Sequence, residues 1–208
     1  LITLHIFDGA KVLKAGDIRS LVILPFDNFT GDDQLEYFVA GMHASLVNDM
    51  GQISGLRVIS KTSASAYRDS DLTATEIARE LRVDGVVEAS VLCLGDSMCM
   101  QFRLIDATGE EEQLWTADYR EEKSQILNLY HQLSKEISGI INVSLTSDEE
   151  SQLADEKEID PEAYELYLKG QFNLDQTSLT SLESAFGYFK AASEIEPEWA
   201  DPYAGLAS

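Results

Sequence analysis

Side chains able to hold a metal or to transfer protons are scattered along this chain of 208 residues. None of the three histidines, His5, His43 and His131, has a second histidine or cysteine three or four residues away, the spacing that puts two zinc ligands on one helical face. Carboxylates are so abundant, with 37 Asp and Glu residues, that a nearby pair says little about acid–base catalysis. The motifs G-x-S-x-G, G-x-G-x-x-G, H-E-x-x-H and the P-loop are absent. We therefore predict no catalytic residue, no bound metal and no cofactor.

The loop of residues 27–33 is the strongest candidate for a ligand contact. It follows an apolar run at residues 21–26, which predicts a buried strand, and it leads into a predicted helix. Open α/β sheets usually bind ligands at the carboxyl ends of such strands. Asp27, Asn28 and Thr30 could therefore contact a small ligand or a peptide. The alternative, which we favour, is that these side chains satisfy backbone groups of the turn.

Aromatic residues of the last fifty positions form a second set of candidates. Tyr164 and Tyr167 could contact a ligand or a partner protein. Packing between helices is the interpretation we favour for the whole set, which comprises Tyr164, Tyr167, Phe186, Tyr188, Phe189, Trp199 and Tyr203.

The two cysteines belong to a predicted β-hairpin formed by residues 86–94 and 98–106 around a Gly-Asp turn. A two-residue turn would pair apolar residues with apolar residues along the hairpin and would set Cys93 opposite Met98. A three-residue turn would set Cys93 opposite Cys99 but would mix the polar and apolar faces. We therefore predict two unpaired cysteines that pack as small apolar side chains, and no Cys93–Cys99 disulfide.

The apolar periodicity of the remaining sequence predicts an α/β domain. A strand at residues 21–26, a helix from Leu35 to Met50 and a strand at residues 56–60 form a strand–helix–strand unit, whose strands should pair in parallel. Thr73 and Glu76 have capping-box spacing and begin a second helix. After the hairpin, residues 114–119 predict a last strand and residues 126–141 a long helix.

These elements set the predicted domain boundaries. Residues 1–19 are an N-terminal extension, and residues 20–145 are the α/β domain. Residues 146–160 are an acidic connector, and residues 161–208 are a helical region that Pro161 opens as a first-turn proline.

The charge of the chain argues against two classes of direct partner. Apolar residues make up 44% of the sequence, enough for a buried core, and 37 acidic against 15 basic residues give a net charge of −22. Such a field repels phosphate backbones and anionic lipid head groups, so we expect no nucleic acid and no membrane surface as a partner. No apolar run approaches the ~18 residues of a membrane span, and no leader peptide is recognisable. We expect a soluble chain, whose oligomeric state the sequence leaves open.

The helical region resembles the start of a tetratricopeptide (TPR) repeat array. The second helix of such a repeat is matched by Ala185, Phe189, Ala192 and Pro197, and the opening of the next repeat by Ala200, Tyr203, Leu206 and Ala207. Gly170 departs from the pattern because it lies fifteen residues before Ala185, where about twelve is usual. Since about three repeats are needed to bury a continuous core, we expect this chain to be a piece of a longer protein.

Residues 20–208 resemble a bacterial module related to the amino-terminal domain of TolB, which in that family is followed by TPR repeats. One departure is Glu88-Ala89-Ser90, where the family usually has Glu-Gly-Ser. The resemblance rests on the joint order of several short motifs: Ser20-Leu21-Val22-Ile23-Leu24-Pro25-Phe26-Asp27-Asn28, Gly31-Asp32, Glu36-Tyr37-Phe38, Gly41-Met42, Gly55-Leu56-Arg57-Val58-Ile59-Ser60-Lys61-Thr62-Ser63, Ile77-Ala78-Arg79-Glu80-Leu81, Leu104-Ile105-Asp106-Ala107, Leu114-Trp115 and Glu162-Ala163-Tyr164-Glu165-Leu166-Tyr167-Leu168-Lys169-Gly170.

The resemblance implies a fold and a class of function. The fold is a three-layer α/β domain with a mixed, partly parallel sheet and helices on both faces, followed by an all-α TPR start. In that family the module accompanies an output domain: an AraC-type or winged-helix DNA-binding domain, an adenylate/guanylate cyclase or a serine/threonine kinase, often across a membrane span. The resemblance brings no catalytic residues to this sequence.

We therefore expect a non-catalytic sensory or protein-interaction module of a bacterial signalling or transcription-regulatory protein. It would bind a protein or peptide partner and regulate an output domain that lies outside these residues. Two alternatives stay open: a small-ligand receptor whose pocket lies beyond Phe26, and the regulatory part of an adenylate/guanylate cyclase. We expect the soluble part of a membrane-anchored protein, on either the periplasmic or the cytoplasmic side.

Overall fold

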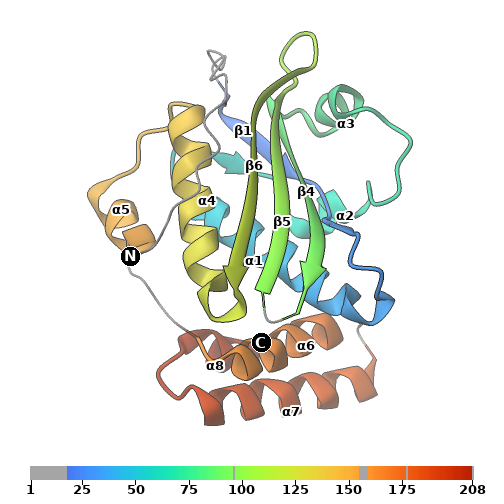
Figure 1. Cartoon of the computed structure of the whole chain (residues 1–208), viewed down its shortest axis with the longest axis vertical. Coiled ribbons are helices and arrows are strands. Elements are labelled where there is room, and N and C mark those ends of the chain that lie inside the picture. Colours follow the sequence, from blue (N-terminus) through green and yellow to red (C-terminus); the bar gives the residue numbers. More distant parts are fainter. Residues whose placement is uncertain (1–17, 96, 155–158, 177, 208) are drawn as a thin grey trace.

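A computed structural model describes residues 18–95, 97–154, 159–176 and 178–207 of the chain. Almost all of the predicted N-terminal extension, with His5, lies outside these residues. The strands are β1 (Ser20–Ile23), β2 (Asp27–Asn28), β3 (Arg57–Val58), β4 (Gly85–Leu94), β5 (Ser97–Asp106) and β6 (Glu112–Glu122) (Figure 1). The helices are α1 (Glu36–Gly51), α2 (Lys61–Ser65), α3 (Ala74–Leu81), α4 (Ile126–Ile140), α5 (Ser147–Ala154), α6 (Pro161–Asp175), α7 (Leu179–Ile195) and α8 (Ala200–Leu206), with 3₁₀ segments at Asp33–Leu35 and Lys123–Gln125.

The sheet is mixed, as the sequence predicts. Its strand order is β3-β1-β4-β5-β6, with β2 paired to β4. β1 pairs in parallel with β3 on one side and with β4 on the other, whereas β4, β5 and β6 form an antiparallel meander. The chain therefore leaves β1 through α1 to reach β3, and then returns through α2 and α3 to the opposite side of β1.

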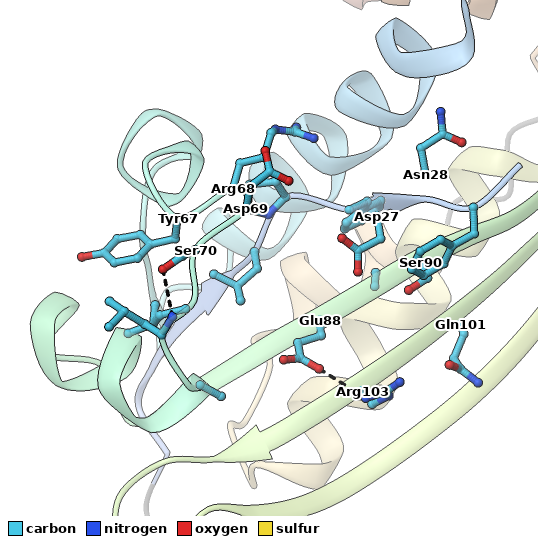
Figure 2. Close-up of a pocket in the computed structure, with 18 of the residues that line it drawn as sticks. Asp27, Asn28, Tyr67, Arg68, Asp69, Ser70, Glu88, Ser90, Gln101 and Arg103 are labelled. Carbon is cyan, nitrogen blue, oxygen red and sulfur yellow. Dashed lines mark hydrogen bonds and ion pairs between the residues drawn. The ribbon is translucent and has the colours of Figure 1, made fainter. Parts of the chain in front are cut away.

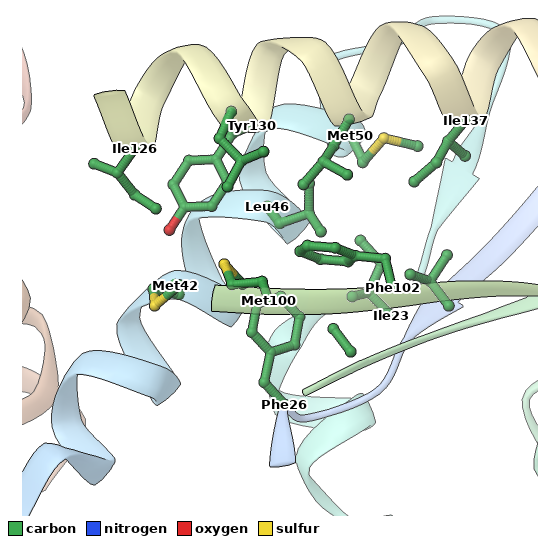
Figure 3. Close-up of a cluster of buried hydrophobic side chains, with 14 of the residues drawn as sticks. Ile23, Phe26, Met42, Leu46, Met50, Met100, Phe102, Ile126, Tyr130 and Ile137 are labelled. Atoms are coloured by element: carbon green, nitrogen blue, oxygen red, sulfur yellow. The ribbon is translucent and has the colours of Figure 1, made fainter. Parts of the chain in front are cut away.

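Helices cover both faces of the sheet, which gives the three layers. On one face, α1 and α4 pack against the apolar side of the β4–β5 hairpin, where Leu46, Tyr130 and Ile137 surround Met100 and Phe102 (Figure 3). Removing a large apolar side chain of this kind from water stabilises the fold by about 1.5–3 kcal/mol. On the other face, α2 and α3 form a smaller cluster with β1, β4 and β5, made of Val22, Ala64, Ala74, Ile77, Ala78, Val83, Val86 and Ile105.

The predicted helix starts are confirmed by their hydrogen bonds. Thr73 and Glu76 form a capping box, in which the Glu76 carboxylate accepts from the Thr73 backbone N–H at 2.8 Å and the Thr73 hydroxyl accepts from the Glu76 N–H at 3.3 Å. Pro161 occupies the first turn of α6, and the Asp160 carboxylate accepts from the backbone N–H of Glu162 at 2.8 Å.

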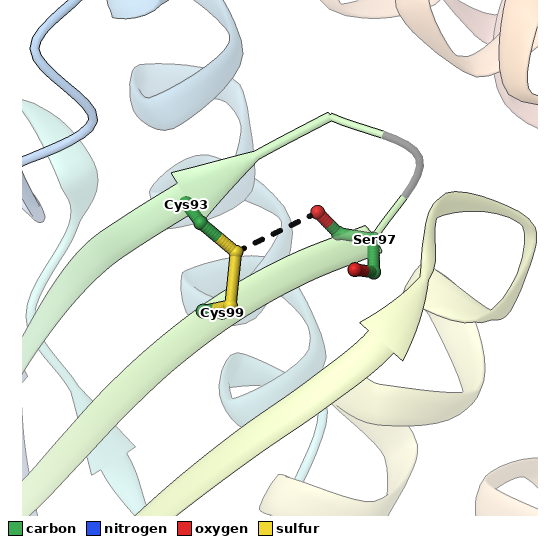
Figure 4. The surroundings of a disulfide bond; sticks show 3 residues. All are labelled: Cys93, Ser97 and Cys99. Atoms are coloured by element: carbon green, nitrogen blue, oxygen red, sulfur yellow. Dashed lines mark hydrogen bonds between the residues drawn. A yellow bond between two sulfur atoms is a disulfide. The ribbon is translucent and has the colours of Figure 1, made fainter.

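The hairpin register corrects one prediction, because Cys93 and Cys99 form a disulfide (Figure 4). The two-residue register holds as far as the pair Val91–Met100, and a β-bulge then shifts it by one residue, so that Cys93 lies opposite Cys99. Leu92, the extra residue in the bulge, is 46% exposed. The bulge leaves the apolar face intact in the part of the hairpin that lies farther from the turn, and it still brings the two cysteines together. The prediction was wrong because it treated the two registers as exclusive.

The helical region shares its core with the sheet. α6 and α7 pack side by side, α8 packs on both, and α6 also packs on α1. The Tyr164 ring lies 5.9 Å from that of Phe38 on α1, and its hydroxyl lies 3.0 Å from that of Tyr130 on α4. Tyr164, Leu168 and Trp199 therefore belong to the same buried cluster as the strands and α1.

Candidate functional site

A cleft of about 650 Å³ opens where β1 ends. Since the chain leaves β1 toward β3 and comes back on the other side toward β4, this is the topological switch point of the sheet, where open α/β sheets bind ligands. Polar side chains of the sheet, Glu88, Ser90, Gln101 and Arg103, line one wall (Figure 2). The segment of residues 67–70, which lies between α2 and α3, lines another.

The three loop residues selected from the sequence lie close together but differ in what their side chains do. Asp27 and Asn28 line the cleft, whereas Thr30 does not. The Asn28 side-chain oxygen accepts from the backbone N–H and hydroxyl of Thr30, at 3.1 and 2.6 Å, and its amide nitrogen donates to the carbonyl of Asp32 at 3.1 Å. The polar groups of Asn28 and Thr30 are therefore engaged within the turn, which leaves Asp27 as the member best able to meet a ligand.

The walls of the cleft carry an excess of negative charge. Two cations face it, and each has a carboxylate partner: Arg68 lies 2.8 Å from Glu36, and Arg103 lies 3.6 Å from Glu88. Burial raises the pKa of Glu88, and the nearby Arg103 opposes that shift. Three more carboxylates line the cleft without a hydrogen bond or ion pair of their side chains within the described part of the chain, namely Asp27, Asp33 and Asp69. A positively charged group is therefore the favoured occupant.

The two aromatic candidates lie elsewhere, in a groove of about 790 Å³ between α1, α4, α6 and α8. Tyr164 forms part of its floor and is almost fully buried, and Tyr167 is half-buried beside it. Both rings also pack against Trp199, with centroids 6.1 and 4.8 Å away. The structure thus places Asp27 and Asn28 in one hollow and Tyr164 and Tyr167 in another, and Thr30 lines neither.

Several lining residues escaped the sequence analysis because they come from distant segments. Arg68 and Asp69 follow α2, in a stretch whose sequence carries no motif. Glu88, Ser90, Gln101 and Arg103 were visible as the polar face of the predicted hairpin, but their position beside Asp27 depends on the pairing of β2 with β4. In the groove, Asp49 and Asp201 gave no local signal at all.

The described residues contain no group of three or more His, Cys, Asp or Glu side chains close enough to hold a metal ion. His43 is buried with its Nε2 atom 2.9 Å from the carbonyl oxygen of Ile23, and burial lowers its pKa to about 4. His131 lies 3.7 Å from Asp49. None of the helices described here is long and apolar enough to cross a membrane.

No protein-family profile matches the chain. A protein of Rhizobium meliloti (strain 1021) named putative adenylate cyclase 3 is 30% identical over 188 residues, which cover 90% of this chain and 32% of that protein. The chain therefore spans about a third of the length of the relative it matches.

Several solved structures of bacterial proteins resemble part of the chain. The lipoprotein GNA1162 from Neisseria meningitidis matches 61% of this chain and 99% of its own, with a TM-score of 0.43 and 17% identity. TolB from Acinetobacter baumannii matches 64% of this chain and 30% of its own, with a TM-score of 0.45 and 14% identity. The C-terminal domain of LpoB from Salmonella enterica matches 54% and 87%, with a TM-score of 0.41 and 18% identity. Similarity at this level carries no inference about what this chain binds.

Proposed function

We propose that this chain is a non-catalytic regulatory segment of a bacterial signalling protein of the adenylate cyclase type, and that it binds a protein or peptide partner. The observation that carries the proposal is the 30% identity over 188 residues to a protein named putative adenylate cyclase, of which this chain corresponds to only 32%. A segment of that size leaves ample length for a separate output domain.

The switch-point cleft supports partner binding by this segment. The cleft has an open polar face of the sheet and an excess of carboxylates. Two of its apolar lining side chains, Phe29 and Leu72, are exposed to solvent. A peptide segment that carries a basic side chain matches these features. We propose Asp27 and Asp69 as its principal contacts, with Asn28 and Thr30 shaping the loop.

The helical region supports a role as the first part of a longer array. We propose the division into residues 20–145, 146–160 and 161–208, with the last segment opening a set of TPR repeats. Leu179, Leu182 and Phe186 recur on one side of α7 and are exposed to solvent, at 83%, 41% and 57%. A stripe of this kind fits a helix that further repeats would cover.

The disulfide bears on the location of the domain. Disulfides persist in oxidising compartments and are rare in the reducing cytoplasm. The Cys93–Cys99 bond therefore favours a site outside the cytoplasm for these residues, as the soluble part of a membrane-anchored protein.

The proposal is tested by selecting ligands on the intact chain from a phage-displayed library of random peptides. We expect enrichment of peptides with a basic residue. Binding to the Asp27→Asn/Asp69→Asn variant should be at least about tenfold weaker, because the loss of even one hydrogen bond to a charged group costs about 1.5–3 kcal/mol. Asn tolerates the positive φ of 57° at position 69, so the fold should be kept.

The Asp71→Asn variant is the matched control, since Asp71 is an exposed carboxylate of the same segment that does not line the cleft. Peptides should bind it as they bind the unaltered chain. Failure to enrich any peptide, or equal binding to the cleft variant, would refute the proposed function.

A further inference from the structure

The groove between α1, α4, α6 and α8 has the size and lining of a small-molecule site. Its volume of about 790 Å³ lies within the range of ~300–1,000 Å³ that is usual for such pockets. The walls are largely apolar and aromatic, with side chains from three helices, α1, α4 and α6: Val47, Leu127, Tyr130, Tyr164, Tyr167 and Leu168.

Two carboxylates from different parts of the fold meet at this groove. Asp49 is near the end of α1 and is 20% exposed, and Asp201 is in the first turn of α8. Asp201 disfavours ionisation of both Asp49 and Tyr167, and all three residues line the same groove. Burial, together with this repulsion, raises the pKa of Asp49 to about 6. Folding has thus brought like charges together beside aromatic rings, an arrangement that a bound cation would relieve.

The groove lining holds two carboxylates and one permanent cation, Lys61, so a net negative charge remains when both carboxylates are ionised. His131 of α4 lies 3.7 Å from the Asp49 carboxylate and is a cation only when protonated. Lys61 of α2 lines the groove beside Ser60 and Val58. The remaining polar lining, which is Ser45, Asn48, Gln52, Ser60 and Gln171, is neutral.

We propose that this groove binds a small organic amine. Its ammonium group would lie between Asp49 and Asp201, and its apolar stem would pack on Tyr167 and the apolar side chains of the groove walls. A tyrosine face attracts an ammonium group, as Lys169 shows nearby by placing its Nζ atom 5.3 Å from the centre of the Tyr37 ring. This site is distinct from the switch-point cleft and does not depend on the peptide partner proposed above.

Isothermal titration of the full chain with three amines and their neutral isosteres tests the proposal. The pairs are phenethylamine with 2-phenylethanol, cadaverine with 1,5-pentanediol, and choline with 3,3-dimethyl-1-butanol. We expect at least one amine to bind about tenfold or more tightly than its isostere, because only the amine compensates the two carboxylates. The affinity should fall as the pH is lowered from 7 to 5, since Asp49 takes up a proton with a pKa of about 6.

Variants separate this site from general surface attraction. Asp201→Asn and Asp49→Asn should each weaken amine binding about tenfold, and Asp49→Asn should also remove most of the pH dependence. Glu198→Gln is the control: Glu198 is an exposed acid just before α8 that does not line the groove. The inference is overturned if no amine binds better than its isostere, if Glu198→Gln weakens binding as much as Asp201→Asn, or if the peptide Gly-Gly-Lys-Gly-Gly binds while all three free amines fail. Peptide selection on the cleft would be unaffected by any of these results.

Discussion

Two ionisable residues on α1, the buried His43 and the partly buried Asp49, have pKa values displaced in opposite directions. Burial, with a smaller effect of Asp201, raises the pKa of Asp49 from 3.8 to about 6. The folded state therefore holds a proton on Asp49 more tightly than the unfolded state does. Protonated Asp49 contributes to the free energy of unfolding below pH ~4, and this contribution is lost as the pH rises through about 6. Burial lowers the pKa of His43 from 6.5 to about 4, so its contribution is present above pH 6.5 and is lost as the pH falls through about 4. Between pH 4 and 6 the two contributions oppose each other.

This opposition predicts an unusual effect of the Asp49→Asn substitution. Without the Asp49 titration, the His43 contribution is no longer offset, and the free energy of unfolding should fall with decreasing pH more steeply than in the unaltered chain, by up to about 1.4 kcal/mol per pH unit. Urea denaturation at several pH values between 4 and 6.5 measures both slopes. The exposed Asp71→Asn variant should keep the original slope. Equal slopes in the Asp49→Asn variant and the unaltered chain would show that Asp49 titrates normally.

At the scale of the helices, the packing of α6, α7 and α8 depends on one aromatic ring held between two glycines. A Cβ atom on Gly170 of α6 would lie 2.5 Å from the Phe189 ring, and one on Gly205 of α8 would lie 2.8 Å from it. Gly187, in the middle of α7, has no neighbouring atom within 4 Å of its Cβ position. The same substitution should therefore have opposite effects at these two kinds of site.

Gly187→Ala should stabilise the protein by up to about 1 kcal/mol, because alanine is the better helix former. Gly170→Ala should destabilise it by about 1–3 kcal/mol, because the Phe189 ring must shift to admit the methyl group. Thermal unfolding of the two variants, side by side, measures the difference. A stabilised Gly170→Ala variant would mean that α6 and α7 do not pack as closely as described.

The elements also show what the sequence could and could not predict. Alternation of apolar and polar residues predicted the β4–β5 register correctly from Val87 to Val91, because one face of each strand is buried. It could not predict the bulge at Leu92, since a single exposed residue leaves the pattern on either side intact, and the disulfide was missed for that reason.

The candidate sites were predictable only where local sequence determines them. The loop at Asp27 follows a recognisable strand, so its position at the end of β1 could be anticipated. The carboxylates Asp49 and Asp201 line the same groove only because α8 packs on α6, which packs on α1, and no local pattern encodes the proximity of such distant segments. Arg68 and Arg103 reach the cleft in the same way, from separate elements.

At the scale of the whole molecule, α1 connects the cleft to the helical region. Glu36 at its beginning pairs with Arg68 in the wall of the cleft, and the neighbouring Tyr37 hydroxyl donates to Glu165 of α6 at 2.9 Å. Farther along α1, Gly41 lies against Leu168 of α6. A partner that displaces the Glu36–Arg68 pair would therefore act on a helix whose other contacts hold α6. This arrangement provides a physical route from an occupied cleft to the helical region of α6, α7 and α8.

We propose that this segment senses a partner and controls a reaction performed by another part of the protein. The most direct test uses a chimera of the Rhizobium meliloti relative in which this chain replaces the matching segment. The rate at which the chimera forms cyclic AMP is measured in the presence and in the absence of a peptide selected on this chain. We predict that the peptide changes the rate by about fivefold or more, that the Asp27→Asn/Asp69→Asn chimera does not respond, and that the isolated chain forms no cyclic AMP from ATP. Cyclic AMP production by the isolated chain, or an unchanged rate in a chimera that binds the peptide, would contradict the account.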